Sequence, residues 1–174
     1  RYVFATFLAG YFTYLCIRGL SLKRTTAALS GIAYASSPTL LTFVYPGQEG
    51  KMLVMGLLPL MVWGLYRLID TRKPIFLFVL AAGVAGGIYT PHLQMLYYAL
   101  IGLGILFVVR LVQTYLVERD IQRATVRSAL AAGGIILGLA VGALGTFPAY
   151  KYTKTESRRA GTEGQGVSIE YAQS

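Results

Sequence analysis

The sequence predicts an all-α, polytopic membrane protein, a transmembrane bundle of about six helices. Its 174 residues are 55% hydrophobic and only 13% charged, and the mean hydropathy is +0.58. Soluble domains contain about 25% charged residues. The apolar residues form long runs between short polar turns, and a membrane-spanning helix needs about 20 predominantly apolar residues. The 20 glycines suit helices that pack closely in lipid.

Six apolar runs account for the predicted spans. They cover Tyr2–Ile17, Thr26–Val44, Met52–Ile69, Ile75–Tyr89, Met95–Val117 and Ser128–Pro148. We expect a charged, partly helical connection over Glu118–Arg127, between the last two runs. The predicted domain organisation is a transmembrane bundle over 1–150, followed by a polar tail over 151–174. We expect the chain to be an internal piece of a longer protein.

Prolines and glycines predict local features inside these runs. Ser36-Ser37-Pro38 predicts a kink in the second run, and Pro59 interrupts the third. Gly134, Gly138 and Gly142 recur every four residues, so they share one face of a helix. That face is expected to pack closely against another helix.

Basic residues predict the orientation of the chain in the membrane. The turns after the first, third and fifth runs, with their flanking helix ends, hold ten of the 16 Lys and Arg residues. The positive-inside rule places these turns in the cytoplasm. Both ends of the sequence are then extracytoplasmic, together with the turns Tyr45–Lys51 and Thr90–Gln94.

The turn Tyr45-Pro46-Gly47-Gln48-Glu49-Gly50-Lys51 is the first candidate site. Pro46 lacks a backbone donor and glycine permits positive φ, which predicts a sharp turn. Lys51 is a point charge suited to phosphate, and Glu49 is its partner or a base. The alternative is a polar hairpin whose charges lie among lipid headgroups, with Glu49 in a simple salt bridge.

Polar residues elsewhere on the same predicted face complete the candidate binding set. His92 is the only histidine, and it follows Pro91 where the apolar sequence breaks. We expect His92 and Gln94 to contact phosphate or sugar, with His92 and Lys51 lining one water-filled pocket. Arg158 could clamp a phosphate bidentately from the tail. The alternatives are an interfacial histidine bonded to a backbone carbonyl and a tail that attracts anionic lipid.

The sequence lacks the residues that are characteristic of several function classes. One histidine and one cysteine, Cys16, cannot build a metal site. Phosphate-loop, nucleophile-elbow and dinucleotide-binding motifs are missing from the sequence. An aromatic and basic stripe for nucleic acid is missing too. We therefore expect no cofactor and no nucleic-acid partner, whereas membrane lipid is an expected partner.

The motifs, taken together, resemble the bacterial YfhO family of polytopic membrane proteins. The resemblance rests on Tyr45–Lys51, Pro59, the segment Pro91-His92-Leu93-Gln94-Met95-Leu96-Tyr97-Tyr98, Ser157-Arg158 and Tyr171–Ser174, in that order. That family is similar to GT-C glycosyltransferases. The resemblance implies transfer of a sugar from a polyprenyl-phosphate donor outside the bacterial cytoplasmic (inner) membrane. The catalytic acid of the GT-C pattern would precede Arg1, so no catalytic residue is assigned here.

Two further functions remain open on the sequence. One is a non-catalytic membrane subunit or scaffold, packed against other membrane subunits of a larger complex. The glycine-rich sixth run and the missing catalytic loop are compatible with it. The other is a piece of a transporter, which is disfavoured because the runs contain almost no charge between the turns.

Overall fold

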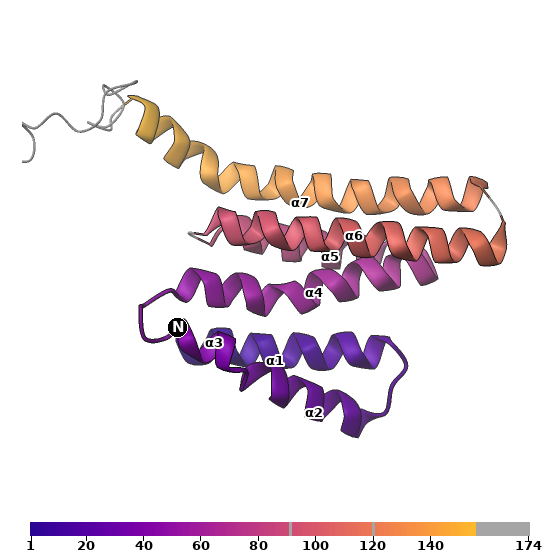
Figure 1. Cartoon of the computed structure of the whole chain (residues 1–174). Coiled ribbons are helices and arrows are strands. Elements are labelled where there is room, and N and C mark those ends of the chain that lie inside the picture. The colour runs from indigo at the N-terminus through magenta and orange to yellow at the C-terminus, as the bar shows by residue number, and fades with distance from the viewer. Residues whose placement is uncertain (91, 120, 156–174) are drawn as a thin grey trace, which may run out of the picture.

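The protein folds into a bundle of helices that lie side by side (Figure 1). The computed structural model describes residues 1–90, 92–119 and 121–155, and this part of the chain contains helices and no β-strand. The seven helices are α1 Tyr2–Gly19, α2 Arg24–Ala35, α3 Pro38–Thr42, α4 Glu49–Thr71, α5 Ile75–Ile88, α6 Leu93–Glu118 and α7 Ile121–Thr155. The all-α prediction is therefore confirmed.

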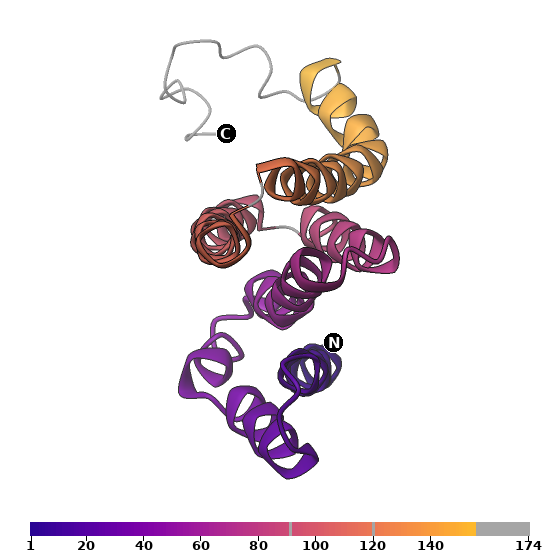
Figure 2. The same ribbon diagram turned by 90° about the vertical axis from the view of Figure 1, so that its right-hand side faces the viewer.

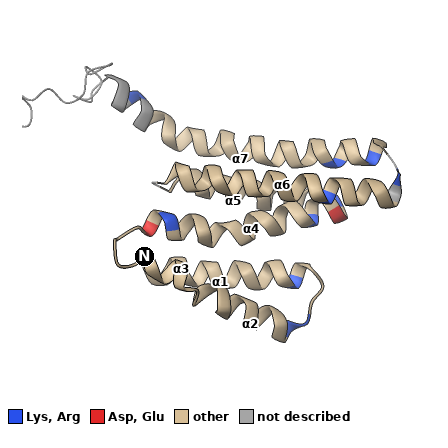
Figure 3. Ribbon diagram, in the orientation of Figure 1, with Lys and Arg blue, Asp and Glu red and all other residues tan. Residues whose placement is uncertain are grey.

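The chain reverses direction at each turn, so the turns gather at two opposite ends of the bundle. One end, here called the Pro46 end, holds the start of α1, the turn before α4, the start of α6 and the end of α7 (Figure 1). The other, the Lys73 end, holds the end of α1 and the turns between α4 and α5 and between α6 and α7. Most of the described Lys and Arg residues lie toward the Lys73 end (Figure 3). The predicted grouping of the turns agrees with this arrangement.

The core lies where α4 and α5 pack against each other and against α6 and α7. Met61, Leu65, Leu68 and Ile69 of α4 are buried, as are Leu80 and Val84 of α5. A smaller cluster of Ala5, Ala9, Leu40 and Met52 joins α1 and α3 to the start of α4. Viewed nearly along the helices, the bundle extends from α2 at one edge to α7 at the other (Figure 2).

Glycines let α7 approach α5 along most of its length. A Cβ added at Gly138 would lie 2.7 Å from Val84 Cβ and 2.8 Å from the Ala81 carbonyl oxygen. Gly134 meets Leu80 and Leu77 in the same way, and Gly142 meets Ile88. The prediction that these three glycines share a packing face is confirmed.

The second apolar run is two helices and not one kinked span. α2 ends at Ala35, and α3 begins at Pro38. Proline disfavours the helical conformation in the residue before it, and Ser37 is accordingly extended, with φ −63° and ψ 138°. The kink predicted at Ser36–Pro38 is therefore a complete break.

Pro59, by contrast, does not interrupt α4. Proline cannot donate the backbone hydrogen bond that the Met55 carbonyl would normally accept. The Tyr34 hydroxyl of α2 donates to that carbonyl instead, at 2.9 Å. Neighbouring side chains that bond freed carbonyls are what allow proline inside helices surrounded by lipid.

The polar segments at the helix ends are shorter than predicted. α4 begins at Glu49, so only Tyr45–Gln48 lies outside helix, and Gly47 alone of its two glycines has positive φ, at 72°. An acidic residue in the first turn is favoured by the helix dipole, which explains the early start. Gln94 likewise lies inside α6. α7 continues through the predicted boundary at residue 150 to Thr155.

In the part of the chain that the structure describes, three helices are long and apolar enough to cross a membrane. They are Glu49–Thr71, Leu93–Val117 and Ile121–Pro148, and Ile75–Ile88 is a shorter apolar helix. The chain thus has the character of an α-helical membrane protein. The count of six spans stays a prediction.

Gly138→Ala is expected to destabilise the bundle by about 1–3 kcal/mol, the usual effect of overpacking. The new Cβ would lie 2.8 Å from a backbone oxygen that cannot rotate away. The measurement is thermal unfolding of the detergent-solubilised protein.

Gly104→Ala is the matched control, because a Cβ there meets nothing within 4 Å. We expect it to leave the melting temperature unchanged or slightly raised, since alanine favours helix over glycine. Equal melting temperatures for the two variants would contradict the close approach of α7 to α5.

Candidate functional site

The start of α4 holds two of the predicted residues, and one of them pairs with a third that the sequence did not indicate. Arg1 Nη1 donates to Glu49 Oε1 at 2.9 Å. Glu49 therefore lies in an ion pair, and Arg1 is the residue that sequence reasoning missed. Arg1, Glu49 and Lys51 are here called the Lys51 cluster. Their charges sum to +1, so the cluster favours an anion.

Lys51 is the cation of this cluster that does not take part in the Arg1–Glu49 salt bridge. Its Nζ lies 5.6 Å from the centre of the Phe43 ring, a cation–π distance. The described salt bridges join Arg1 to Glu49 and Arg110 to Asp70, so no described carboxylate pairs with Lys51. Lys51 is partly exposed, and its ammonium can reach an incoming phosphate.

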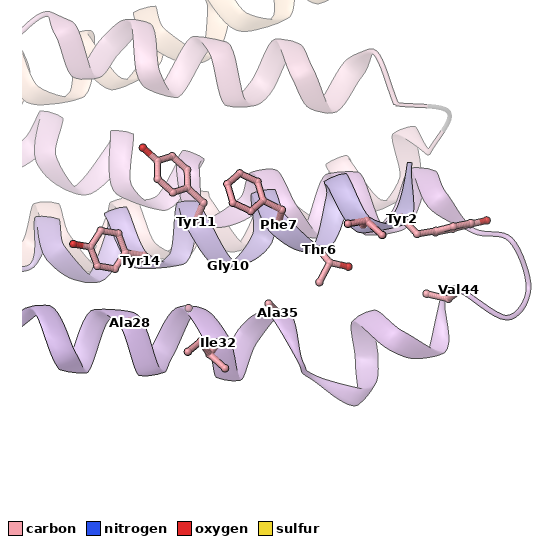
Figure 4. A pocket seen from close by; sticks show the side chains of 12 residues that line it. Tyr2, Thr6, Phe7, Gly10, Tyr11, Tyr14, Ala28, Ile32, Ala35 and Val44 are labelled. Atoms are coloured by element: carbon pink, nitrogen blue, oxygen red, sulfur yellow. The ribbon is translucent and has the colours of Figure 1, made fainter.

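An apolar groove of about 690 Å³ extends from this end of the bundle along α1 and α2. Figure 4 shows its lining side chains on the two helices. The lining consists of Tyr2, Val3, Thr6, Phe7, Gly10, Tyr11 and Tyr14 from α1, Ala28, Gly31, Ile32 and Ala35 from α2, and Val44 beyond α3. The α1 residues recur at helical spacing, a signal that could have indicated the groove from the sequence.

The mouth of the groove lies next to the Lys51 cluster. Tyr2 and Val44 line it, and they are the chain neighbours of Arg1 and Phe43. The Tyr2 hydroxyl lies 3.7 Å from the position that a Cβ at Gly47 would take, so Tyr2 reaches the turn itself. The span from Tyr2 to Tyr14 is twelve helical steps, about 18 Å at 1.5 Å per residue. This arrangement joins a positive mouth to an apolar channel.

His92 and Gln94 lie at the start of α6, also at the Pro46 end. His92 occupies the position before the first helical residue, and its carbonyl accepts from the Met95 amide at 3.1 Å. Gln94 Nε2 donates to the Tyr98 hydroxyl at 3.2 Å, as the predicted i, i+4 spacing implies. The side chains of Gln94 and Tyr98 are exposed at this end.

A small cavity joins the α4 and α6 parts of the site. It has a volume of about 190 Å³ and is lined by Val54, Met55 and Leu58 of α4 and by Met95, Tyr98 and Ala99 of α6. Val54, Met55 and Leu58 follow Lys51 at helical spacing, and Tyr98 is the partner of Gln94. The cavity therefore lies between the helix that carries Lys51 and the helix that carries Gln94. The lining of this cavity includes neither Lys51 nor His92, and their shared pocket stays a prediction.

Two further expectations concern residues around this site. Arg158 lies outside the described residues, together with the rest of the tail after Thr155. Within the described part of the chain, no group of three or more His, Cys, Asp or Glu residues could hold a metal ion.

Comparisons with protein-family models, with curated proteins and with solved structures each gave no match.

Glu49→Gln is expected to change the free energy of unfolding by less than about 1 kcal/mol, because exposed ion pairs contribute little. The Arg1 side chain is 84% exposed, so water replaces the lost carboxylate. The measurement is denaturant unfolding in detergent, compared with Asp70→Asn, which removes the less exposed Arg110 pair. A loss for Glu49→Gln larger than that for Asp70→Asn would show that the ion pair holds α1 to α4.

Proposed function

We propose that this protein binds a lipid-linked phosphate at the Pro46 end of the bundle. The observation that carries the proposal is that Lys51 lies over the ring of Phe43, whose chain neighbour Val44 lines one end of the apolar groove between α1 and α2. A lipid phosphate is an anion attached to a long apolar chain. Such a ligand needs a cation for its phosphate and an apolar groove close by for its chain. The described residues offer both at this end.

The more specific form of the proposal is a GT-C-like glycosyltransferase that uses a polyprenyl-phosphate-linked sugar. The motifs that the structure describes support it, because Tyr45–Lys51, Pro59 and the residues from His92 to Tyr98 fall at the Pro46 end or on helices that begin there. In this reading the protein is a multi-pass protein of the bacterial cytoplasmic membrane, with six spans. The Pro46 end and both ends of the chain face the extracytoplasmic side.

The residues of the site would act mainly by positioning and charge stabilisation. As the bond between the sugar and the phosphate oxygen breaks, negative charge develops on the departing phosphate, and Lys51 stabilises it. His92 and Gln94 would contact the phosphate or the sugar, and Arg158 would supply a second cation. Glu49, which forms a salt bridge with Arg1, would hold that cation at the site. No residue of this chain is assigned as the catalytic acid or base.

A second candidate function is that of a non-catalytic subunit in a membrane complex. The observation in its favour is the exposure of α6, because only 11% of an 18-residue apolar stretch of this helix is buried inside the bundle. Such a surface can face lipid, but it can also pack against another subunit. Under this alternative the Lys51 cluster would have no preference for a lipid phosphate.

Binding of a polyprenyl phosphate to the protein in neutral-lipid nanodiscs tests the proposal. We expect Lys51→Gln to weaken binding about tenfold or more, a loss of about 1.4 kcal/mol. Ile32→Trp, which fills the groove from α2, is expected to weaken binding as well, because the apolar chain loses its channel.

Matched controls separate these effects from general damage. Leu29→Trp changes an equally exposed residue of α2 that does not line the groove. Lys73→Gln removes a cation at the opposite end. We expect both controls to bind like the wild type. Equal affinity for all four variants would contradict the proposal and favour the subunit function.

A further inference from the structure

Another pocket, which has arginine side chains in its lining, lies at the other end of the bundle, where α1, α4 and α5 meet. It has a volume of about 290 Å³ and is lined by Arg18, Gly19, Ser21, Trp63, Arg67 and Phe76, among others. We call it the Trp63 pocket. It lies at the Lys73 end, remote from the Lys51 cluster, so the function proposed above makes no use of it.

Two arginines line the Trp63 pocket, and neither has a carboxylate partner among the described residues. Arg18 Nη1 donates to the Leu22 carbonyl at 2.6 Å, and Arg67 Nη1 donates to the Gly19 carbonyl at 3.4 Å. Both acceptors are neutral backbone groups. The salt bridges among the described residues lie elsewhere, at Arg1–Glu49 and Arg110–Asp70. Each guanidinium has five N–H donors, so both arginines retain donors for an anion.

The walls of the pocket hold the arginines in place. The Arg67 guanidinium lies 5.4 Å from the centre of the Phe76 ring, which fixes its position by stacking. Trp63 packs edge-on against the same ring, with 5.6 Å between ring centres. Its indole Nε1 is buried and has no hydrogen-bond partner among the described residues. The two aromatic rings thus form the wall against which Arg67 is held.

The surrounding charges are also positive. Lys23 and Arg24 lie at the start of α2, and Arg72 and Lys73 lie in the turn between α4 and α5. The nearby acid Asp70 is engaged by Arg110, with 2.7 Å between the two groups. Two arginines in one pocket repel each other unless an anion lies between them. The local field thus attracts an anion and the pocket supplies donors for it.

We propose that the Trp63 pocket binds the phosphate group of an anionic phospholipid. Basic pockets between membrane helices on the positively charged side of a protein are suited to anionic headgroups. The exposed apolar side chains of Ile75 and Phe78 on α5 flank Phe76 in sequence and offer a surface for the lipid chains. Arginine pairs bind phosphate oxygens bidentately, which a diffuse basic surface does not do.

The single tryptophan of the chain provides the test, because it lies in the pocket wall. The protein is placed in neutral phosphatidylcholine bilayers, and its fluorescence is quenched with bromine-labelled lipids. We expect bromine-labelled phosphatidylglycerol to reach Trp63 with about tenfold higher apparent affinity than bromine-labelled phosphatidylcholine. Equal quenching by the two lipids would overturn the proposal. This comparison uses the wild-type protein, so it does not depend on the folding of any variant.

Variants and a soluble probe assign the effect to the pocket. The pair Arg18→Gln and Arg67→Gln should abolish the preference, whereas Lys23→Gln with Lys73→Gln, which removes the same charge outside the pocket, should lower it only slightly. If the control pair loses as much, binding is to the general basic surface and the proposal fails. Glycerol phosphate is then added to the protein in neutral bilayers. A tryptophan response to it at millimolar concentration, without a lipid preference, would identify a free phosphate and overturn the lipid assignment.

Discussion

The close approach of α5 to the helices on both sides of it is the contact on which the bundle depends. On one side, a Cβ at Gly64 of α4 would lie 2.8 Å from the Leu80 amide nitrogen, and one at Gly83 of α5 would lie 2.7 Å from Met61. On the other side, Gly138 of α7 meets the Ala81 carbonyl. Lipid chains are as apolar as leucine, so helices in a membrane gain stability from such van der Waals packing more than from burial alone. The 14 residues of α5 can therefore hold together much longer helices.

This packing fixes the two ends of the bundle as separate chemical environments. The Pro46 end combines the Arg1–Glu49 ion pair, the separate cation Lys51 and an apolar groove, which suits an amphiphilic anion. The Lys73 end combines several cations with a pocket between helices, which suits a phosphate headgroup. Because helices of this length separate the two ends, a substitution at one end is not expected to alter binding at the other.

The sequence predicted the helical fold and the grouping of turns better than it predicted local geometry. Long apolar runs and glycines at four-residue spacing depend on local sequence, and both predictions agree with the structure. The salt bridge of Arg1 with Glu49 joins residues 48 positions apart, and the bond from Tyr34 to the Met55 carbonyl depends on the packing of α2 against α4. Neither follows from spacing. α2 ends before Pro38, whereas α4 continues through Pro59, so a proline in the sequence does not by itself determine where a helix ends.

The orientation of the two ends across a membrane is the central claim, and cysteine labelling tests it most directly. In a Cys16→Ala background, Gln48→Cys marks the Pro46 end and Lys73→Cys marks the Lys73 end. In sealed, right-side-out membrane vesicles, a membrane-impermeant maleimide is expected to label Gln48→Cys at once and Lys73→Cys only after the vesicles are opened. Labelling of both positions from the same side of intact vesicles would contradict the arrangement of the helices across the membrane and, with it, both proposed lipid sites.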